Sequence, residues 1–323
     1  MQPVRGPGAR VVVAGGAGFL GSHVCTALLA AGASVLCLDD LSTGRAENLR
    51  GLRDEPGFRF ERVDVTGPVT VDGPVDAVLH LASPASPIDY ARLPLATLAA
   101  GSAATLRLLE LAEAKSARFL LASTSEVYGE PEVHPQPETY WGNVNPIGPR
   151  SVYDEAKRFA EALTTCFRRE KGVDTGIVRI FNTYGPGMRP DDGRLVPTLV
   201  GQALRGEPAT IAGTGEQTRS LCYVSDTVRG LLAFTDSGHP GPVNIGSDRE
   251  TTVREIADVI AELTGGTVEP VHVPRPEDDP TRRRPDISLA RDLLGWRPTV
   301  PLVEGLSRTI EAMAAEHAAG ALR

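Results

Sequence analysis

Two residues near the middle of the chain could act together as a base. Tyr153 and Lys157 are four residues apart in a segment, 152–171, whose pattern predicts a helix, so the two side chains share one helix face. An ammonium group beside a phenol favours the phenolate and is expected to lower the tyrosine pKa below its ordinary value of about 10. Such a base could take a proton from a sugar hydroxyl. Because tyrosine and lysine are common at this spacing, the pair alone establishes no function.

A glycine-rich turn near the start of the chain predicts a dinucleotide site. A short apolar run, 10–14, ends at Gly15, Gly18 and Gly21, and a helical pattern follows. In a strand–turn–helix context, such glycines let the backbone approach a pyrophosphate at the helix N-terminus. An ordinary strand-to-helix turn is the alternative. The residues of this turn expected to contact the cofactor are Gly15, Gly18, Phe19 and Leu20.

Acidic residues after the next strands refine the choice of cofactor. The run 34–38 ends in Asp39 and Asp40, about 20 residues beyond the glycine turn, where an acid binds the adenosine ribose in such sites. Since a carboxylate repels a 2′-phosphate, the sequence favours NAD over NADP. A later strand-like run ends in Asp64 and Val65, which we expect beside the adenine.

The order of apolar runs and helical patterns predicts the fold. Strand-like runs alternate with helical segments, which is typical of a parallel sheet covered on both faces. We expect an α/β protein with a Rossmann-type, doubly wound parallel sheet and a smaller α/β C-terminal substrate-binding lobe. The expected NAD-binding domain is 1–186, with 221–247 returning to it, and the expected lobe is 187–220 with 248–323.

Bulk properties exclude several classes of function. The net charge of −8 over 323 residues argues against a nucleic-acid or membrane-surface partner. The cysteines are scattered without the spacing of metal ligands, so we expect no metal. We find no apolar signal-peptide run at the N-terminus and no segment that approaches the length of a membrane span. The prediction is a soluble, cytoplasmic protein.

Together these motifs resemble those of the extended short-chain dehydrogenases and, within them, the UDP-glucuronate decarboxylases (UDP-xylose synthases). The similarity extends from about residue 10 to about residue 310. The general family marks are the three glycines and the Tyr153–Lys157 pair. Stretches more typical of the decarboxylases are 80–87 (HLASPASP), 123–129 (STSEVYG), 140–150 (YWGNVNPIGPR), 189–194 (RPDDGR), 217–219 (QTR) and 279–286 (DPTRRRPD).

The resemblance implies NAD-dependent decarboxylation of UDP-glucuronate to UDP-xylose. NAD would oxidise carbon 4 of the sugar while Tyr153 takes the hydroxyl proton. The ketone then lies β to the carboxylate and can carry the enolate left by loss of carbon dioxide. Protonation of carbon 5 and return of the electrons would give UDP-xylose, so the protein is expected to be a carboxy-lyase with recycled NAD.

The resemblance also implies roles for individual residues. Thr124 matches the hydroxyl that contacts the reacting oxygen, and Ser125 and Glu126 match the pair near carbon 5. The implied catalytic residues are Tyr153, Lys157, Thr124, Ser125, Glu126 and Arg283. Because diphosphates favour guanidinium donors, arginines are prominent among the implied substrate contacts, which are Ser125, Glu126, Asn182, Arg194, Arg219 and Arg283. The remaining implied cofactor contacts are Thr43, Gly44, Leu81, Ser83 and Thr183.

The sequence departs from the family pattern at four positions. Ala96, Ala99 and Gly101 stand where lysines and an asparagine are usual, and Gly187 stands where arginine is frequent. With fewer cations to hold the keto intermediate, the protein is expected to release some UDP-4-keto-pentose.

Two expectations concern residues outside the reacting group. His80 is expected to be a structural histidine beside the sheet. The resemblance implies a homodimer, in which the helices near 95–115 and 151–171 of two subunits form a four-helix bundle. The sequence itself shows only their apolar faces.

Other functions remain open from the residues. A nucleotide-sugar 4,6-dehydratase would share the fold and the first oxidation, but Ser125 is a poor acid where related dehydratases have aspartate. A 4-epimerase would need neither Glu126 nor the loop around Arg283. A non-catalytic NAD-binding sensor or scaffold would not need an intact Tyr153 and Lys157.

Overall fold

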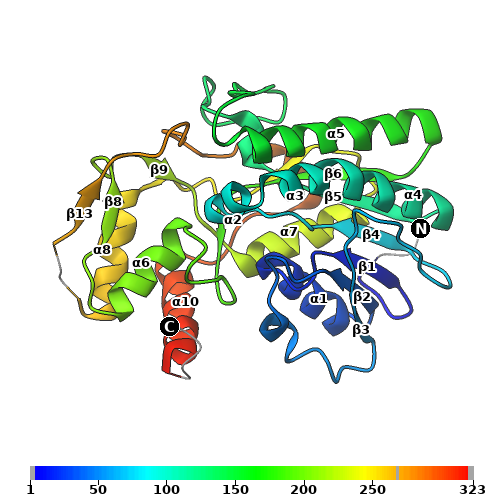
Figure 1. The fold of residues 1–323 in the computed structure, drawn as a ribbon, viewed down its shortest axis with the longest axis horizontal. Coiled ribbons are helices and arrows are strands. Elements are labelled where there is room, and N and C mark those ends of the chain that lie inside the picture. The colour runs from blue at the N-terminus through cyan, green and yellow to red at the C-terminus, as the bar shows by residue number, and fades with distance from the viewer. Residues whose placement is uncertain (1–3, 267–268, 319–323) are drawn as a thin grey trace.

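The computed structural model describes residues 4–266 and 269–318. At its centre is a parallel sheet of seven strands (Figure 1). The strands follow one another across the sheet in the order β11 (Val243–Ile245), β6 (Thr175–Ile180), β5 (Arg118–Thr124), β4 (Ala77–His80), β1 (Arg10–Ala14), β2 (Ser34–Asp39) and β3 (Phe58–Arg62). The chain order reverses between β1 and β4, which is where open α/β sheets bind their ligands.

Helices cover both faces of the sheet (Figure 1). One face is covered by α1 (Phe19–Ala30) and α7 (Val224–Asp236), and the other by α5 (Ser151–Lys171) and a segmented helix. The segmented helix consists of α3 (Pro94–Ala99), a single π-helical turn, η2 (Ala100–Ala104), and α4 (Thr105–Lys115). The expected Rossmann-type, doubly wound architecture is therefore confirmed.

The central strands are mostly apolar because both faces of the sheet are buried. Along β1, Val11 and Val13 pack with Val24 of α1, whereas Val12 packs in the opposite layer with Leu108 of α4. This alternation follows from the two-residue period of a strand. The two packed layers fix the carboxyl ends of the strands, where the predicted motifs begin.

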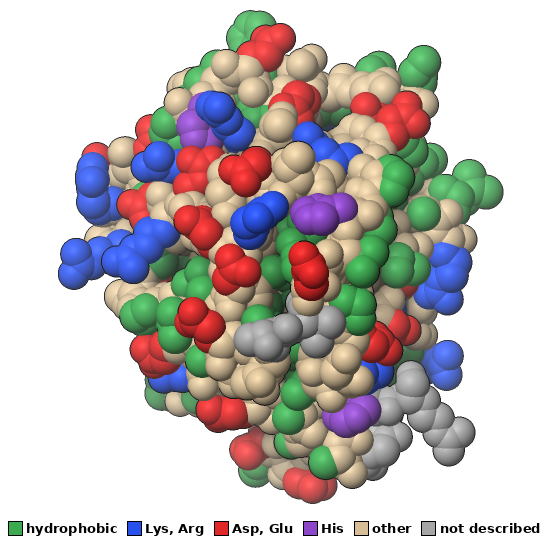
Figure 2. All heavy atoms as spheres, turned by 90° about the vertical axis from the view of Figure 1, so that its left-hand side faces the viewer, with side chains coloured by type: hydrophobic (Ala, Val, Ile, Leu, Met, Phe, Trp, Pro, Cys, Tyr) green, Lys and Arg blue, Asp and Glu red, His purple; other side chains and the backbone are tan. Residues whose placement is uncertain are grey.

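The remaining elements form a smaller lobe beside the sheet (Figure 1). It contains α6 (Leu195–Leu204), α8 (Val253–Thr264), α10 (Leu302–Ala318), the strand pair β8 (Thr210–Ala212) and β13 (Val271–Val273), and the pair β9 (Thr218–Arg219) and β12 (Thr251–Thr252). Ile256 of α8 and Met313 of α10 join the same apolar cluster as Val13, so the core is continuous between sheet and lobe. On the outer face of the lobe, acidic and basic side chains are interspersed (Figure 2).

Several short elements complete the fold. They are η1 (Ala46–Leu49), α2 (Pro87–Arg92), η3 (Ser125–Tyr128), β7 (Thr183–Tyr184) with its partner β10 (Cys222–Tyr223), and α9 (Ser288–Leu294). Helix α9 packs against α7 and β11. The chain therefore crosses between sheet and lobe several times, and residues from distant parts of the sequence meet where it crosses.

The stretch Pro94–Lys115 is long and apolar enough, by length and composition, to cross a membrane. The expectation that no segment has this property is therefore wrong. Half of the stretch is buried, and Leu108 and Leu109 belong to the core beneath the sheet. We interpret it as a core helix of the Rossmann fold, whose apolar residues are used in packing.

Gly101 allows the segmented helix to approach α5 closely. A Cβ atom added at Gly101 would overlap the carbonyl group of Ala156, with only 2.7 Å to its carbonyl carbon. Close-packed interiors do not absorb such an overlap without a shift of the backbone. Because Ala156 directly precedes Lys157, this contact also sets the position of the reactive helix face.

We expect Gly101→Ala to lower the free energy of unfolding by about 2 kcal/mol, because the added methyl group would push α5 away from η2. Urea denaturation followed by circular dichroism would measure the change. The matched control is Gly51→Ala, since nothing lies within 4 Å of a Cβ added at Gly51. Equal stability of the two variants would contradict this account of the packing.

Candidate functional site

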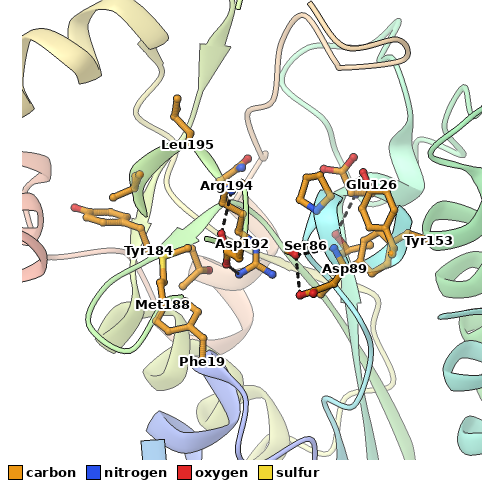
Figure 3. Close-up of a pocket in the computed structure, with 18 of the residues that line it drawn as sticks. Phe19, Ser86, Asp89, Glu126, Tyr153, Tyr184, Met188, Asp192, Arg194 and Leu195 are labelled. Atoms are coloured by element: carbon orange, nitrogen blue, oxygen red, sulfur yellow. Dashed lines mark hydrogen bonds and ion pairs between the residues drawn. The ribbon is translucent and has the colours of Figure 1, made fainter. Parts of the chain in front are cut away.

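A cavity of about 810 Å³ opens between the carboxyl ends of the central strands and the lobe. Its volume is in the upper part of the range for small-molecule sites. Figure 3 shows Glu126, Tyr153 and Asp89 on one side, facing Asp192 and Arg194 on the other. The cavity therefore lies where the reversal of strand order predicts a ligand.

Most of the predicted site residues line this cavity. They are Gly15, Gly18, Phe19, Leu20, Thr43, Leu81, Ser83, Thr124, Ser125, Glu126, Tyr153, Lys157, Asn182, Thr183, Arg194 and Arg219. The predicted residues outside its lining are Asp39, Asp40, Gly44, Asp64, Val65 and Arg283. Within the described ranges, no group of three or more His, Cys, Asp or Glu residues could hold a metal ion.

The glycine turn has the shape that a dinucleotide requires. Gly15 has a φ of +82°, and a Cβ there would lie 2.5 Å from the backbone nitrogen of Ala82. A Cβ on Gly21 would overlap the carbonyl oxygen of Gly15. Gly18 directly precedes α1, so the free N–H groups at the start of this helix lie at the cavity wall. Residues of this shape and polarity fit the diphosphate of a dinucleotide.

Asp39 holds the glycine turn in place from outside the cavity wall. Its carboxylate accepts hydrogen bonds from the backbone N–H groups of Ala17 and Leu41, both at 2.9 Å. Gly44 lies so close that a Cβ there would be 2.7 Å from Asp39 Oδ1. Burial raises the pKa of Asp39, whereas Asp40 is exposed. Neither acid lines the cavity, so the contact of these acids with a ribose stays a prediction.

Tyr153 and Lys157 both reach the cavity, but their electrostatics differ from the expectation. The Lys157 ammonium donates to the carbonyl oxygen of Ala122 at 2.9 Å and lies 5.9 Å from the centroid of the Tyr153 ring. Burial raises the pKa of Tyr153 to about 12, and Thr124 and Arg194 offset this only in part. The expected lowering of the Tyr153 pKa is therefore wrong, because desolvation outweighs the hydrogen bond of Thr124 and the charge of Arg194. Burial also lowers the pKa of Lys157 to about 8.

Glu126 is held between two arginines. Its Oε2 accepts hydrogen bonds from Arg150 Nη2 at 2.6 Å and from Arg283 Nη2 at 3.2 Å. Burial alone would favour the neutral acid, but Arg283 and Arg150 together hold the pKa of Glu126 at about 2. At neutral pH Glu126 is therefore a carboxylate with no proton to donate.

Arg283 lies behind Glu126 and not in the cavity wall. Its side chain is 1% exposed, and its Nη1 donates to the carbonyl oxygen of Ser125 at 2.7 Å. Both hydrogen bonds of Arg283 are to protein groups, so its direct contact with a substrate stays a prediction. Arg219 does line the cavity and pairs with Asp279 at 2.8 Å.

Several residues of the site were not predicted. Tyr90 stacks on Tyr153 with ring centroids 5.5 Å apart, and the Arg150 guanidinium lies 6.0 Å from the Tyr90 ring centroid. Arg189 pairs with Asp89 at 3.1 Å across the cavity wall. Arg150 could have been predicted, because it directly precedes the helix that carries Tyr153 and Lys157. Nothing in the sequence indicates that Tyr90 stacks on Tyr153.

His80 lies between the sheet and the π-helical turn. Its Nε2 is 3.1 Å from the Thr105 hydroxyl and 3.2 Å from the carbonyl oxygen of Ala100. Burial, with the charge of Lys157, lowers the pKa of His80 to about 3, so the ring is neutral. These contacts agree with the structural role expected for His80.

The four departures from the family pattern lie in different places. Gly187 lines the cavity, whereas Ala96 is exposed on α3 and Ala99 is half-buried. Gly101 packs against α5. Of these four residues, only Gly187 lies in the cavity wall, where the arginine side chain that is frequent in the family is missing.

Comparisons with known sequences agree with these observations. The family described as the NAD dependent epimerase/dehydratase family matches residues 11–246. The chain is 50% identical over 299 residues to UDP-glucuronic acid decarboxylase 2 of Arabidopsis thaliana, covering 93% of this chain and 67% of the relative. It is 48% identical over 301 residues to UDP-glucuronic acid decarboxylase 1 of Xenopus tropicalis, covering 93% and 71%.

Solved structures share the whole architecture. A UDP-glucose 4-epimerase of Thermotoga maritima, solved with UDP-glucose, has a TM-score of 0.87 and 33% identity, covering 95% of this chain and 99% of the epimerase. A UDP-glucuronic acid 4-epimerase of Bacillus cereus, solved with UDP-glucuronic acid and NAD, has a TM-score of 0.84 and 28% identity with the same coverage.

Removing the charge of Glu126 should destabilise the protein, because Arg150 and Arg283 would lose the carboxylate that they share. We expect Glu126→Gln to lower the free energy of unfolding by about 3 kcal/mol at pH 7. The pKa of Glu126 is lowered from 4.5 to about 2, so its stabilisation is present above about pH 4.5 and is lost as the pH falls toward 2.

Urea denaturation at pH 7 and pH 4 would therefore show a smaller difference between wild type and variant at the lower pH. The control is Glu110→Gln, which breaks an exposed pair with Arg107 and should change stability by less than about 1 kcal/mol. A Glu126→Gln effect of equal size at both pH values would exclude the proposed charge pairing.

Proposed function

The chain belongs to the NAD-dependent epimerase/dehydratase family, and within it we propose a carboxy-lyase that decarboxylates UDP-glucuronate to UDP-xylose. The observation that carries the proposal is the arrangement around Tyr153. A reactive tyrosine lies at the cavity wall beside Glu126, a carboxylate fixed by two arginines. The decarboxylases that match this chain at about 50% identity support the same reaction.

The residues present fit NAD as the cofactor. Its diphosphate would lie over Gly15 and Gly18 at the start of α1, with Leu81 and Thr183 farther along the cavity. When bound, NAD supplies the electron acceptor that converts the alcohol at carbon 4 into a ketone and later returns the electrons.

Tyr153 exchanges the proton of the sugar hydroxyl. Burial favours its neutral phenol, so Tyr153 must first release its own proton to solvent. As phenolate, stabilised by the groups around it, Tyr153 can then accept the proton of the sugar hydroxyl. The Thr124 hydroxyl and Arg194 already lower the pKa of Tyr153, and the Lys157 ammonium lies within 5.9 Å of the ring. Once protonated, Tyr153 can donate a hydrogen bond to the ketone oxygen and stabilise the enolate left by decarboxylation.

The arginines of the cavity wall would bind the anionic groups of the substrate. Arg219, Arg194 and Arg150 all line the cavity, and guanidinium groups bind diphosphate and carboxylate oxygens in pairs. We propose that Arg283 acts through Glu126 and Ser125, which it holds in position. The nucleotide would then lie toward the lobe of residues 187–220 and 248–323, and the cofactor toward residues 1–186 and 221–247.

We also propose that the protein is a cytoplasmic homodimer. Leu95 and Leu98 of α3 and Phe159 of α5 are 79%, 39% and 52% exposed, and α3 packs against α5. Exposed apolar side chains on two adjacent helices are typical of a protein–protein interface. A second copy of the same face would cover them as a four-helix bundle.

Incubation with UDP-glucuronate and NAD should release carbon dioxide and form UDP-xylose, detected by mass spectrometry. Tyr153→Phe should lower the rate by about 1000-fold, because the proton of the carbon-4 hydroxyl would have no acceptor. Tyr140→Phe is the matched control, since the Tyr140 hydroxyl only accepts a hydrogen bond from Glu132 N–H at 3.1 Å.

The same assay separates the alternatives. UDP-galacturonate without carbon dioxide would identify a 4-epimerase, and a 4-keto-6-deoxy sugar from UDP-glucose a 4,6-dehydratase. Bound NAD with no turnover of any of these substrates would favour a sensor or scaffold. We expect a minor UDP-4-keto-pentose product, because Gly187 lines the cavity where the family frequently has an arginine that could hold the keto intermediate. Formation of UDP-xylose alone would contradict this expectation.

Phe159→Asp should convert the dimer to a monomer, because a charge would be buried at the centre of the interface. Size-exclusion chromatography with light scattering would measure the mass. Val303→Asp is the control, since Val303 is 53% exposed on α10 of the lobe. A monomeric wild-type protein, or a dimeric Phe159→Asp variant, would count against this interface.

A further inference from the structure

Asp154 is a buried carboxyl group next to the reactive tyrosine, and the chemistry described above gives it no role. It lies in the first turn of α5 and is 5% exposed. Its Oδ1 is buried and has no hydrogen-bond partner. Other acids around the cavity are paired with arginines: Glu126 with Arg150, Asp89 with Arg189, Asp192 with Arg194, and Asp279 with Arg219.

The surroundings of Asp154 favour its protonated form. Burial raises the pKa of Asp154 to about 7, and the negative charge of Glu126 adds to this effect, while Arg150 and Arg283 oppose it. Glu155, the next residue on α5, contributes further negative charge. The phenols of Tyr153 and Tyr90, which also lie near Asp154, are neutral at this pH. Asp154 can therefore hold or release a proton near neutral pH, whereas Glu126 cannot.

Decarboxylation consumes one proton in each turnover. The bond between carbon 5 and the carboxylate breaks, its electron pair remains in the enolate, and carbon 5 must then gain a proton. The proton that Tyr153 takes from the carbon-4 hydroxyl returns to the same oxygen when the ketone is reduced. A second proton must therefore come from solvent through the protein, and Glu126 is held as a carboxylate.

We propose that Asp154 stores this second proton and passes it to carbon 5 of the sugar through a water molecule bound beside Glu126. The proposal rests on the proposed function. Entry of the anionic sugar places another negative charge near Asp154, which favours the loaded acid. Departure of neutral carbon dioxide removes that charge, and solvent reprotonates Asp154 before the next turnover. Asp154 is thus a relay that acts through water and does not itself line the cavity.

The pH dependence of Asp154→Asn tests this role. In the wild type, kcat for carbon dioxide release should fall as the pH rises above 7, because Asp154 then loses the proton that it must deliver. The bound anionic sugar raises the pKa of Asp154 above its value of about 7 in the free protein. Asp154→Asn should lower kcat by about 100-fold with little change in KM, and this alkaline decline should disappear. Asp154→Glu should restore the decline. Glu170→Gln, which alters an exposed acid near the C-terminal end of α5, should keep the wild-type profile.

A binding measurement provides a readout that does not depend on turnover. In a Tyr153→Phe background, calorimetry of UDP-glucuronate binding at pH 8 in buffers of different ionisation enthalpy should show proton uptake. Adding Asp154→Asn should reduce that uptake.

An unchanged pH profile or unchanged uptake in the Asn variant would overturn the relay. If Asp154→Asn does not fold, Asp154→Ser takes its place in both measurements. A wild type that releases no carbon dioxide would overturn the proposed function itself, so the two failures are distinguishable.

Discussion

The carboxylate of Glu126, shared by Arg150 and Arg283, is the contact on which the rest of the site depends. It joins three segments that are far apart in the sequence: the turn after β5, the residue before α5, and the loop that returns from the lobe. A buried carboxylate between two guanidinium groups is stable only when all three are present. The lobe must therefore dock on the sheet before the cavity has its final shape.

The same pairing of charges occurs around the whole cavity. Asp192 faces Arg194, Asp89 faces Arg189, and Asp279 faces Arg219. An acidic protein can bind a polyanionic ligand if its few local arginines are held in place and only partly neutralised. Anionic oxygens of a ligand would then bind the same arginines, either beside these carboxylates or in their place. The free energy of binding would therefore depend on which anion each arginine contacts and not on the net charge of the protein.

The sequence predicted the fold and most of the cavity lining because both depend on local patterns. Strand ends carry the motifs, and a parallel sheet brings all carboxyl ends of its strands to one edge, which placed Gly15, Thr124 and Thr183 together correctly. The position of Arg283 behind Glu126 could not be predicted, because it depends on how a loop 157 residues away in sequence packs. The stacking of Tyr90 on Tyr153 was missed for the same reason.

The failure to predict the pKa of Tyr153 has a wider physical meaning. Helical spacing shows that Lys157 is near, but not how much water the fold removes from the phenol, and here desolvation is the larger effect. The same exclusion of water raises the pKa of Asp154. Glu126, between these two groups, is kept ionised by its arginines. Burial thus raises the pKa of both Tyr153 and Asp154 beside a carboxylate that its arginines keep ionised. Tyr153 can act as a base only after it loses its own proton, whereas Asp154 keeps a proton that it can donate near neutral pH.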